Sequence, residues 1–471
     1  MKRFLQLIPL CLLLSCATYY QMNMVFNQDF ETGNMVEAEK VLVQNAKAAD
    51  SKEKFLYFLN RGTVAAMLDK PEESNIYFEK AFIYGEDYRT NYFNEAGALV
   101  LNPTVIEYKG EDHEHLLLLY YKALNYIKLG DRESALVECR RLNNRLLKLN
   151  DKYKKDSRYK RDAFIHNLMG LIYDADKDYN NAFIAYRNAY NIYKEDYSEM
   201  FGIKAPKQLK KDLLRTAYLM GFNTELMAYE SEFGIKYKPD NSESGDLIFL
   251  WNNGLGPVKD EFSINFTLIH GQEGMVTFVN KEQGYNFPFH YEQEEKKEGE
   301  EEKEGSDLTD LEFYRVAIPK YMERKAVFQK ATLTVNDQSF KLEEAEDINK
   351  IAFYSLKQRM GLELSKSLLR LALKKLAEKE LRDENEGLGA LLGAFNAYTE
   401  KADTRNWQTI PHSIYYTRAK LPVGVSKAKL NMTGQGASQT HEFTFHVQGG
   451  QTIFQSFYSL EHVPYKRYNS Y

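Results

Sequence analysis

A repeated spacing of small and aromatic residues between Ala123 and Ala189 is the feature that most constrains the fold of this chain. In each of two copies, a small residue is followed three, twelve, sixteen and nineteen positions later by further small, aromatic or apolar residues. The copies are Ala123/Tyr126/Ala135/Cys139/Leu142, with Gly130 at the turn, and Gly170/Tyr173/Ala182/Tyr186/Ala189. Small residues let two antiparallel helices approach closely, and the larger ones fill the seam between them. The spacing therefore predicts stacked pairs of helices.

This spacing resembles the tetratricopeptide repeat, a helix–turn–helix unit with a period of about 34 residues. Weaker copies begin at Phe26 and Gly62. Four helical pairs can share a continuous core by stacking on their neighbours, and a helix from Lys207 to Glu232 is expected to close the stack. We therefore predict a tetratricopeptide-like α-solenoid over residues 16–235.

The N-terminus has the features of an export signal. Lys2 and Arg3 precede an apolar run, Phe4–Leu14, that is too short for a bilayer span of about 20 residues but is typical of a secretory signal. The run ends in Leu13-Leu14-Ser15-Cys16, which resembles the bacterial lipobox, where a peptidase cleaves before a cysteine that has received diacylglycerol. We predict a lipoprotein signal peptide over residues 1–15 and lipidation of Cys16. The alternative is an ordinary signal peptide with a chance cysteine.

Several acyl chains on Cys16 would anchor the protein stably to a membrane. No acidic run follows Cys16, so the resemblance to other outer-membrane lipoproteins favours the outer membrane facing the periplasm. The inner membrane and the cell surface remain alternatives. With Cys11 lost in the signal and Cys16 lipidated, only Cys139 is left, so no intramolecular disulfide can form. Loss of Lys2 and Arg3 with the signal takes the formal charge from −5 to −7, a balance that gives no nucleic-acid footprint.

The pattern changes after a polar linker over residues 236–245. Short runs rich in Val, Ile, Phe and Thr and bounded by Gly, Pro and Asn predict strands. These are Asp246–Trp251, Phe262–His270, Met275–Asn280, Leu311–Ile318, Ala326–Val335, His412–Lys420, Val423–Asn431, His441–Val447 and Thr452–Leu460. A Glu/Lys/Gly run over 292–307 predicts a disordered loop, and helical periodicity predicts an insert over 345–402 that carries Gly389-x-x-x-Gly393.

The predicted fold class is therefore α + β. An N-terminal solenoid is followed by a β-rich, sandwich-like domain over residues 246–471, interrupted by a helical hairpin. Whether its strands form one sheet or two is left open.

Four stretches resemble the recurrent blocks of an uncharacterised family of bacterial tetratricopeptide-containing envelope lipoproteins. They are Tyr108–Glu111, Lys122–Tyr126 through Val137–Arg141, Asn253–Lys259, and Ala402–Trp407 with Ile410-Pro411. The resemblance implies a fold and a location rather than a reaction. Because members of this family are often encoded beside lipoproteins that resemble activators of cell-wall synthases, it also implies a role in the envelope.

Few residues suggest chemistry. His113-Glu114-His115 could be a metal site, but residues two apart on a helix point to different faces, and no third ligand follows at a metal-site spacing. The Asn253–Lys259 block could bind an anion, but a turn between strands is favoured. Asp403, Arg405 and Trp407 could hold a ligand by stacking and bidentate hydrogen bonds; the alternative is an internal ion pair packed under the indole. We predict no enzyme activity, cofactor or metal.

The main functional prediction is a lipid-anchored scaffold that binds a protein or peptide in the concave groove of the solenoid. The repeat register places Tyr120, Lys128, Asn167 and Asp174 in that groove. The alternative is a lipoprotein that captures glycans or nutrients, and an envelope hydrolase would require an open cleft at Asp403–Trp407. An exposed Trp407 would favour a ligand site, and a buried one would favour the scaffold. The oligomeric state stays undetermined.

Overall fold

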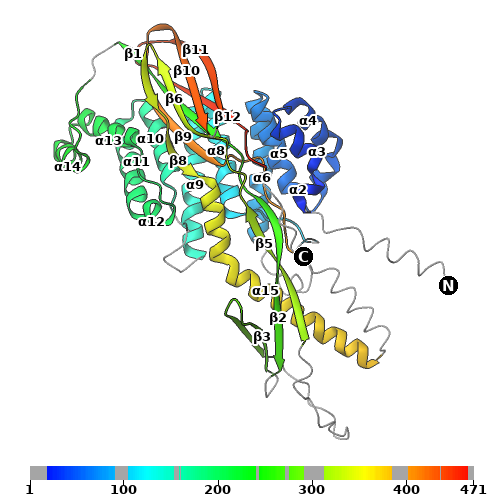
Figure 1. The fold of residues 1–471 in the computed structure, drawn as a ribbon. Coiled ribbons are helices and arrows are strands. Elements are labelled where there is room, and N and C mark those ends of the chain that lie inside the picture. Colours follow the sequence, from blue (N-terminus) through cyan, green and yellow to red (C-terminus); the bar gives the residue numbers. More distant parts are fainter. Residues whose placement is uncertain are drawn as a thin grey trace.

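The computed structural model describes residues 18–90, 104, 106–152, 159, 161–239, 243–270, 275–290, 312–384, 401–434 and 436–464. Helices come first along the chain and strands follow, with one long helix between the strands (Figure 1). The predicted lipidation site Cys16, the run 292–307 and the Gly389-x-x-x-Gly393 motif lie outside the described residues. Among the residues described, no helix is both long and apolar enough to cross a membrane.

The N-terminal half is a stack of antiparallel helix pairs. The pairs are α3 (Met24–Glu31) with α4 (Met35–Gln44), α5 (Lys54–Met67) with α6 (Pro71–Thr90), α8 (Asp112–Lys128) with α9 (Arg132–Lys152), α10 (Ala163–Ala175) with α11 (Tyr179–Ile192), and α13 (Lys207–Leu219) with α14 (Asn223–Phe233). Short elements join them: α2 (Tyr19–Met22), a 3₁₀ turn (Ala46–Asp50), a π-helical turn (Tyr193–Tyr197) and α12 (Ser198–Met200). The prediction of a single closing helix from Lys207 to Glu232 is wrong. Gly221, with φ +70°, breaks it into a further pair.

The seam spacing has the predicted physical basis. A Cβ on Gly170 of α10 would lie 2.4 Å from the ring of Tyr186 on α11, and one on Gly62 of α5 would lie 2.7 Å from the ring of Phe78 on α6. Both rings are fully buried. Glycine is therefore needed at these positions because an aromatic side chain of the partner helix occupies the space of its missing side chain.

The strands form three four-stranded sheets. The inner sheet has the order β12-β1-β9-β8, the outer sheet β11-β10-β6-β7, and the third sheet β4-β3-β2-β5. Their bounds are β1 (Ser244–Asn253), β2 (Val258–His270), β3 (Met275–Asn280), β4 (Tyr285–His290), β5 (Glu312–Met322), β6 (Phe328–Val335), β7 (Gln338–Lys341), β8 (Glu343–Asp347), β9 (Ser413–Pro422), β10 (Gly424–Gly434), β11 (Ser438–Val447) and β12 (Thr452–Ser459). The nine predicted strands are confirmed. β4, β7 and β8 were missed, two of them because they are only four or five residues long.

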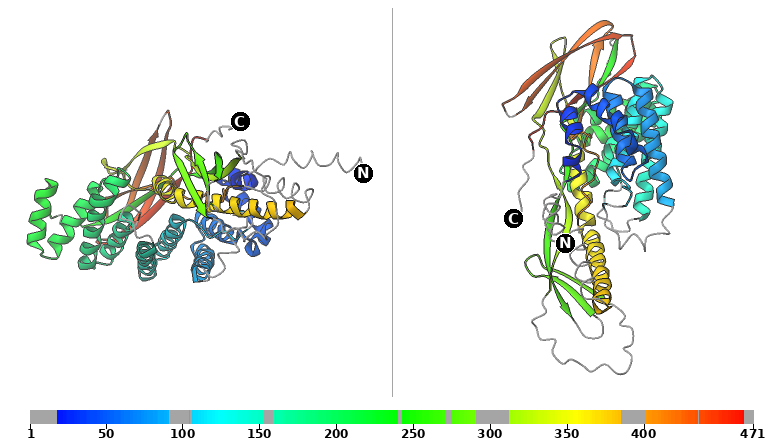
Figure 2. Two further views of the ribbon diagram at one scale, coloured as in Figure 1. Left: turned by 90° about the horizontal axis from the view of Figure 1, so that it is seen from below. Right: turned by 90° about the vertical axis from the view of Figure 1, so that its right-hand side faces the viewer.

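Strand β1 is buried on both faces. Ile248 and Leu250 belong to the apolar cluster shared with the helices, whereas Leu247, Phe249 and Trp251 belong to the cluster between the inner and outer sheets. The order of layers is thus helices, inner sheet, outer sheet. The helices form a curved row beside the strands (Figure 2). The prediction of a sandwich-like domain is confirmed. The sandwich consists of the inner and the outer sheet.

The third sheet and α15 (Ile348–Glu384) form a projection, which we call the arm. Ile264 and Phe266 of β2 pack with Leu364 and Leu368 of α15 in a separate apolar cluster. The arm extends beyond the rest of the molecule (Figure 2). The first helix of the predicted insert is confirmed as α15, and the second lies outside the described residues.

The seam glycines can be tested with a matched pair of substitutions. We expect Gly170→Ala to lower the free energy of unfolding by about 1–3 kcal/mol, because the added methyl group overpacks the seam against Tyr186. Gly361 also lies inside a helix, but a Cβ there would meet nothing within 4 Å. Gly361→Ala should therefore raise the same free energy by about 0.5–1 kcal/mol. Urea unfolding measures both, and equal effects would contradict the seam interpretation.

Candidate functional site

The predicted concave groove is filled by the inner sheet. Tyr120 of α8 is buried, and its hydroxyl donates to Asn252 Oδ1 of β1 at 3.1 Å. Asn167 of α10 is fully buried, and Asp174 is buried beside Arg418 of β9. The prediction that these three side chains line an open partner groove is therefore wrong. These side chains lie on the inner face of the helical stack, as the repeat register predicts. The protein's own strands cover that face.

Lys128, the fourth predicted groove residue, lies apart from the other three. It belongs to the last turn of α8, is about half exposed, and forms an ion pair with Asp69 at the turn between α5 and α6. Lys128 therefore lies at the rim of the helical stack and not against the inner sheet.

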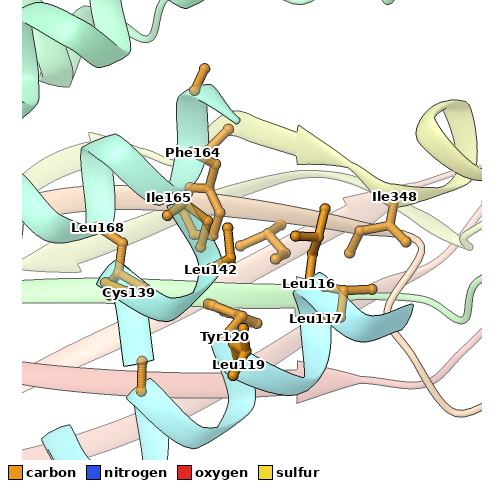
Figure 3. Close-up of a cluster of buried hydrophobic side chains, with 14 of the residues drawn as sticks. Leu116, Leu117, Leu119, Tyr120, Cys139, Leu142, Phe164, Ile165, Leu168 and Ile348 are labelled. Atoms are coloured by element: carbon orange, nitrogen blue, oxygen red, sulfur yellow. The ribbon is translucent and has the colours of Figure 1, made fainter. Parts of the chain in front are cut away.

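The first helices of successive pairs build this packed face together. Leu116 and Tyr120 of α8, Phe164 and Ile165 of α10, and Ile348 at the start of α15 belong to one apolar cluster (Figure 3). Buried polar groups lie beside this packing, between the two halves of the chain. Besides hydrogen bonds such as that between Tyr120 and Asn252, three contacts centred on ion pairs join the two halves in the described part of the chain.

The first polar contact centres on Glu111, the N-cap residue of α8. Its carboxylate forms ion pairs with Lys259 of β2 and Arg359 of α15. Burial opposes ionisation, but the two cations outweigh it and hold the pKa of Glu111 well below its usual range. The carboxylate therefore stays charged and links the helical stack to both β2 and α15 of the arm.

Glu114, one turn further along α8, is buried beside this contact. It accepts hydrogen bonds from the Glu111 N–H at 2.9 Å, the Tyr108 hydroxyl at 2.9 Å and the Trp407 N–H at 2.6 Å. Burial, followed by repulsion from Glu111, raises the pKa of Glu114 to about 7. This carboxyl therefore titrates near neutrality although it lies inside the protein.

The predicted ligand junction is closed. Arg405 donates from Nε and Nη2 to the two oxygens of Asp403, at 2.9 and 2.8 Å, and from Nη1 to the Ile106 carbonyl at 3.0 Å. Trp407 is fully buried, 5.5 Å from the ring of Tyr121, and its Nε1 donates to Thr409 Oγ1. The structure brings the three residues together as an internal pair beside an indole. The prediction that these three residues hold a ligand is therefore wrong, because the junction is filled by their own contacts.

The two histidines of the His113-Glu114-His115 motif have different surroundings. His113 is buried 6.2 Å from the ring of Tyr321, and burial lowers its pKa to about 4. His115 Nε2 lies 2.8 Å from the Lys109 carbonyl, and its ring packs on Phe55. Within the described ranges, no group of three His, Cys, Asp or Glu residues is placed to hold a metal ion.

The second polar contact centres on Arg418 of β9. Its Nη2 donates to Asp174 of α10 at 2.6 Å, and its Nε lies 2.9 Å from Asp212 of α13. Arg215 also pairs with Asp174. One strand residue therefore bridges two helix pairs, and Asp174 pairs with the protein's own arginines where the groove prediction placed a protein or peptide partner.

The third polar contact centres on Arg324, which is fully buried after β5. Its Nε donates to the Gly256 carbonyl at 2.7 Å, its Nη2 to the Gln408 carbonyl, and its Nη1 to Glu31 of α3 at 2.8 Å. In each of the three contacts a cation of the C-terminal half pairs with a carboxylate of the helical half.

Sequence reasoning missed Glu111, Lys259, Arg324, Arg359 and Arg418 as contact residues. A signal existed for two of them, because three of the blocks quoted for the family resemblance meet here. The Asn406 side chain accepts from the Lys259 N–H at 3.2 Å and donates to the Pro257 carbonyl at 2.8 Å, beside Glu111. The blocks therefore mark the junction between the two halves.

Two of the hollows among the described residues lie against the helical half. The first is a small cavity of about 20 Å³ lined by His113, Tyr120, Asp162 and Glu346 among others, and it has space for about one water molecule. The second is an open groove of about 510 Å³ on the helical half, which we call the α6–α9 groove. It is lined by Glu72, Asn75, Ile76, Glu79, Tyr126, Leu129, Ser134, Val137, Glu138 and Arg141.

The walls of the α6–α9 groove are held by contacts between helices. Lys122 is buried, and its Nζ lies 2.9 Å from Glu138 and pairs with Glu79 across the groove. Arg141 reaches the same two carboxylates at 3.1–3.3 Å. Glu79, Glu138 and Arg141 are thus paired within the protein, and Ile76, Leu129 and Val137 expose apolar surface in the groove.

The comparisons with known proteins identify no family. No family model matches the chain, and no curated protein matches it. Among solved structures, BtubC (BKLC) from P. vanneervenii is 12% identical, with 47% of this chain and 84% of that chain covered and a TM-score of 0.31. The MamA protein is also 12% identical, with 46% and 96% covered and a TM-score of 0.28. Because both TM-scores are low, neither similarity carries an argument about this chain.

The Arg418 contact can be tested by Arg418→Met. We expect a loss of about 3–5 kcal/mol in the free energy of unfolding, because the buried Asp174 and Asp212 lose their shared partner. Lys429→Met is the control. Lys429 pairs with Glu442 at the surface, where both side chains are at least half exposed, and its loss should cost about 0–1 kcal/mol. Similar urea midpoints for the two variants would contradict the assignment.

The raised pKa of Glu114 predicts a pH dependence of stability. The folded state holds this proton more tightly than the unfolded state, so its stabilising effect is complete below pH 4.5 and is lost as pH rises through about 7. Relative to Glu114→Gln, the wild type should lose up to about 1.4 kcal/mol per pH unit within that window. Urea unfolding at successive pH values measures the difference. Glu133→Gln, at an exposed position, is the control, and its stability relative to the wild type should not change across this window. A stability difference between wild type and Glu114→Gln that stays constant with pH would refute the prediction.

Proposed function

We propose that this chain is a lipid-anchored scaffold of the bacterial cell envelope that binds an apolar segment of a partner protein in the α6–α9 groove. The lipobox-like Leu13–Cys16 sequence supports the anchor, with the outer membrane facing the periplasm as the proposed location. The observation that carries the partner site is the groove itself, which is open and has a volume of about 510 Å³. The concave face, the default binding surface of a solenoid, is already occupied by the inner sheet.

The groove has the properties that recognition of a helical segment requires. Ile76, Leu129 and Val137 are exposed by 57%, 39% and 37%, so a partner can bury apolar surface there. Arg141 packs 4.9 Å above the ring of Phe82, and Asn125 donates to Ser74 and Asn75 at 2.8 and 2.9 Å. These contacts hold α6, α8 and α9 together before a partner arrives, which lowers the ordering cost of binding.

The other two interpretations lose their main support. A hydrolase would require an open cleft at the Trp407 junction, and an exposed Trp407 would favour glycan capture. Trp407 is fully buried under Tyr121 and Phe78. Binding of an amphipathic segment requires neither. The proposed role is non-enzymatic and needs no cofactor.

In-cell photo-crosslinking tests the groove. A benzophenone amino acid in place of Val137 should capture a specific protein, whereas one in place of Ile184 of α11, which is exposed by the same 37%, should not. Leu129→Glu should reduce the capture at position 137 by about tenfold or more, because a charge replaces buried apolar contact worth at least about 1.4 kcal/mol.

Mass spectrometry of the crosslinked segment decides the outcome. An apolar, helix-forming segment captured at position 137 and lost in Leu129→Glu supports the proposal. Equal capture at positions 137 and 184, or capture that Leu129→Glu leaves unchanged, refutes the α6–α9 groove as the binding site.

A further inference from the structure

The folded body begins almost directly after Cys16. Thr18 is buried and caps α2: its N–H donates to Gln21 Oε1 at 2.9 Å, and its Oγ1 accepts from the Gln21 N–H at 3.3 Å. The next residue, Tyr19, is also buried, and its N–H donates to Thr404 Oγ1 at 3.0 Å. The chain is therefore held to the body from Thr18 onward.

The distance from Cys16 to the body is short for covalent reasons. An extended chain spans at most about 3.6 Å per residue, so Cys16 and Thr18 can be only about 7 Å apart. A lipidated cysteine lies at the bilayer surface because its acyl chains are in the hydrocarbon. If Cys16 carries the lipid, α2 and the start of α3 must therefore lie at the membrane surface.

The segment that follows Cys16 exposes apolar side chains and contains no charged residue. Met22, Met24 and Val25 are exposed by 61%, 53% and 66%. From Cys16 to Gln28 the sequence contains no Asp, Glu, Lys or Arg, although these residues make up 27% of the chain. Exposed apolar side chains next to a lipid anchor can enter the interfacial region without carrying a charge into it. We call Met22, Met24 and Val25 the α2–α3 face.

We propose that the α2–α3 face inserts into the interfacial region of the lipid bilayer that holds the acyl chains of Cys16. The inference rests on the lipid anchor of the proposed function and adds an orientation to it. A protein on a long flexible linker would tumble above the bilayer, whereas this one stands on a fixed face. The short tether and the apolar face act together, since the tether brings the face to the lipid and the face holds the body there.

Fluorescence quenching in vesicles tests this orientation with a matched pair of labels. The full-length lipidated protein carries an environment-sensitive fluorophore on Met22→Cys or on Met227→Cys of α14, two positions with the same exposed fraction of 61%. Cys139 is buried, and burial raises its thiol pKa to about 12, so the introduced thiol is labelled in preference to it. The proteins are reconstituted into phosphatidylethanolamine/phosphatidylglycerol vesicles whose acyl chains carry bromine as the quencher.

The label at position 22 should lose most of its fluorescence in brominated vesicles, while the label at position 227 should keep it. Met24→Glu/Val25→Glu in the position-22 protein should abolish the quenching without changing its thermal unfolding, because both side chains are exposed. Equal fluorescence at positions 22 and 227 on proteins that float with the vesicles would overturn the proposed orientation alone. If the protein fails to float with the vesicles, or if the Cys16→Ser variant floats as well as the wild type, the lipid anchor is absent. The orientation proposal then falls with it.

Discussion

The burial of β1 on both of its faces is the constraint on which the rest of the structure depends. A strand that faces solvent on one side alternates apolar and polar residues, but Leu247–Trp251 is an unbroken apolar run and every residue in it is fully buried. The helical stack covers one face of β1, and the outer sheet covers the other. Because both are required to bury the strand, the helices and the sandwich are joined through it.

Apolar packing does not by itself set how the two halves are aligned, because it is non-directional. The three buried polar contacts supply direction. Lys259, Arg324 and Arg418 each approach from the C-terminal half and meet carboxylates of the helical half. A displacement along β1 would leave these charges buried and unpaired, which costs several kcal/mol for each ion. The polar contacts therefore select one alignment from the many that the apolar surfaces would tolerate.

This arrangement changes which surfaces can meet other molecules. The inner face of a solenoid usually binds partners, but here it holds the inner sheet, with Tyr120 hydrogen-bonded to Asn252 of β1. The surfaces left to solvent include the α6–α9 groove and the α2–α3 face. The two proposals assign the first to a protein and the second to lipid, and both surfaces lie in the helical half. The C-terminal half supplies the rigid support and the projecting arm.

The sequence by itself determined the local structure of this protein. The spacing around Gly170 and Tyr186 predicted the helix seams, because it reflects the 3.6-residue period of the helix. Runs rich in Val, Ile, Phe and Thr and bounded by Gly, Pro and Asn predicted nine strands, because β-branched and aromatic side chains fit a pleated sheet. The register of Tyr120, Asn167 and Asp174 on the inner face was also readable. Their partners were not, because Asn252 and Arg418 come from strands more than a hundred residues away. Only the tertiary structure decided that the inner face is closed and Trp407 buried, since burial depends on which distant segments pack together and no local period records that.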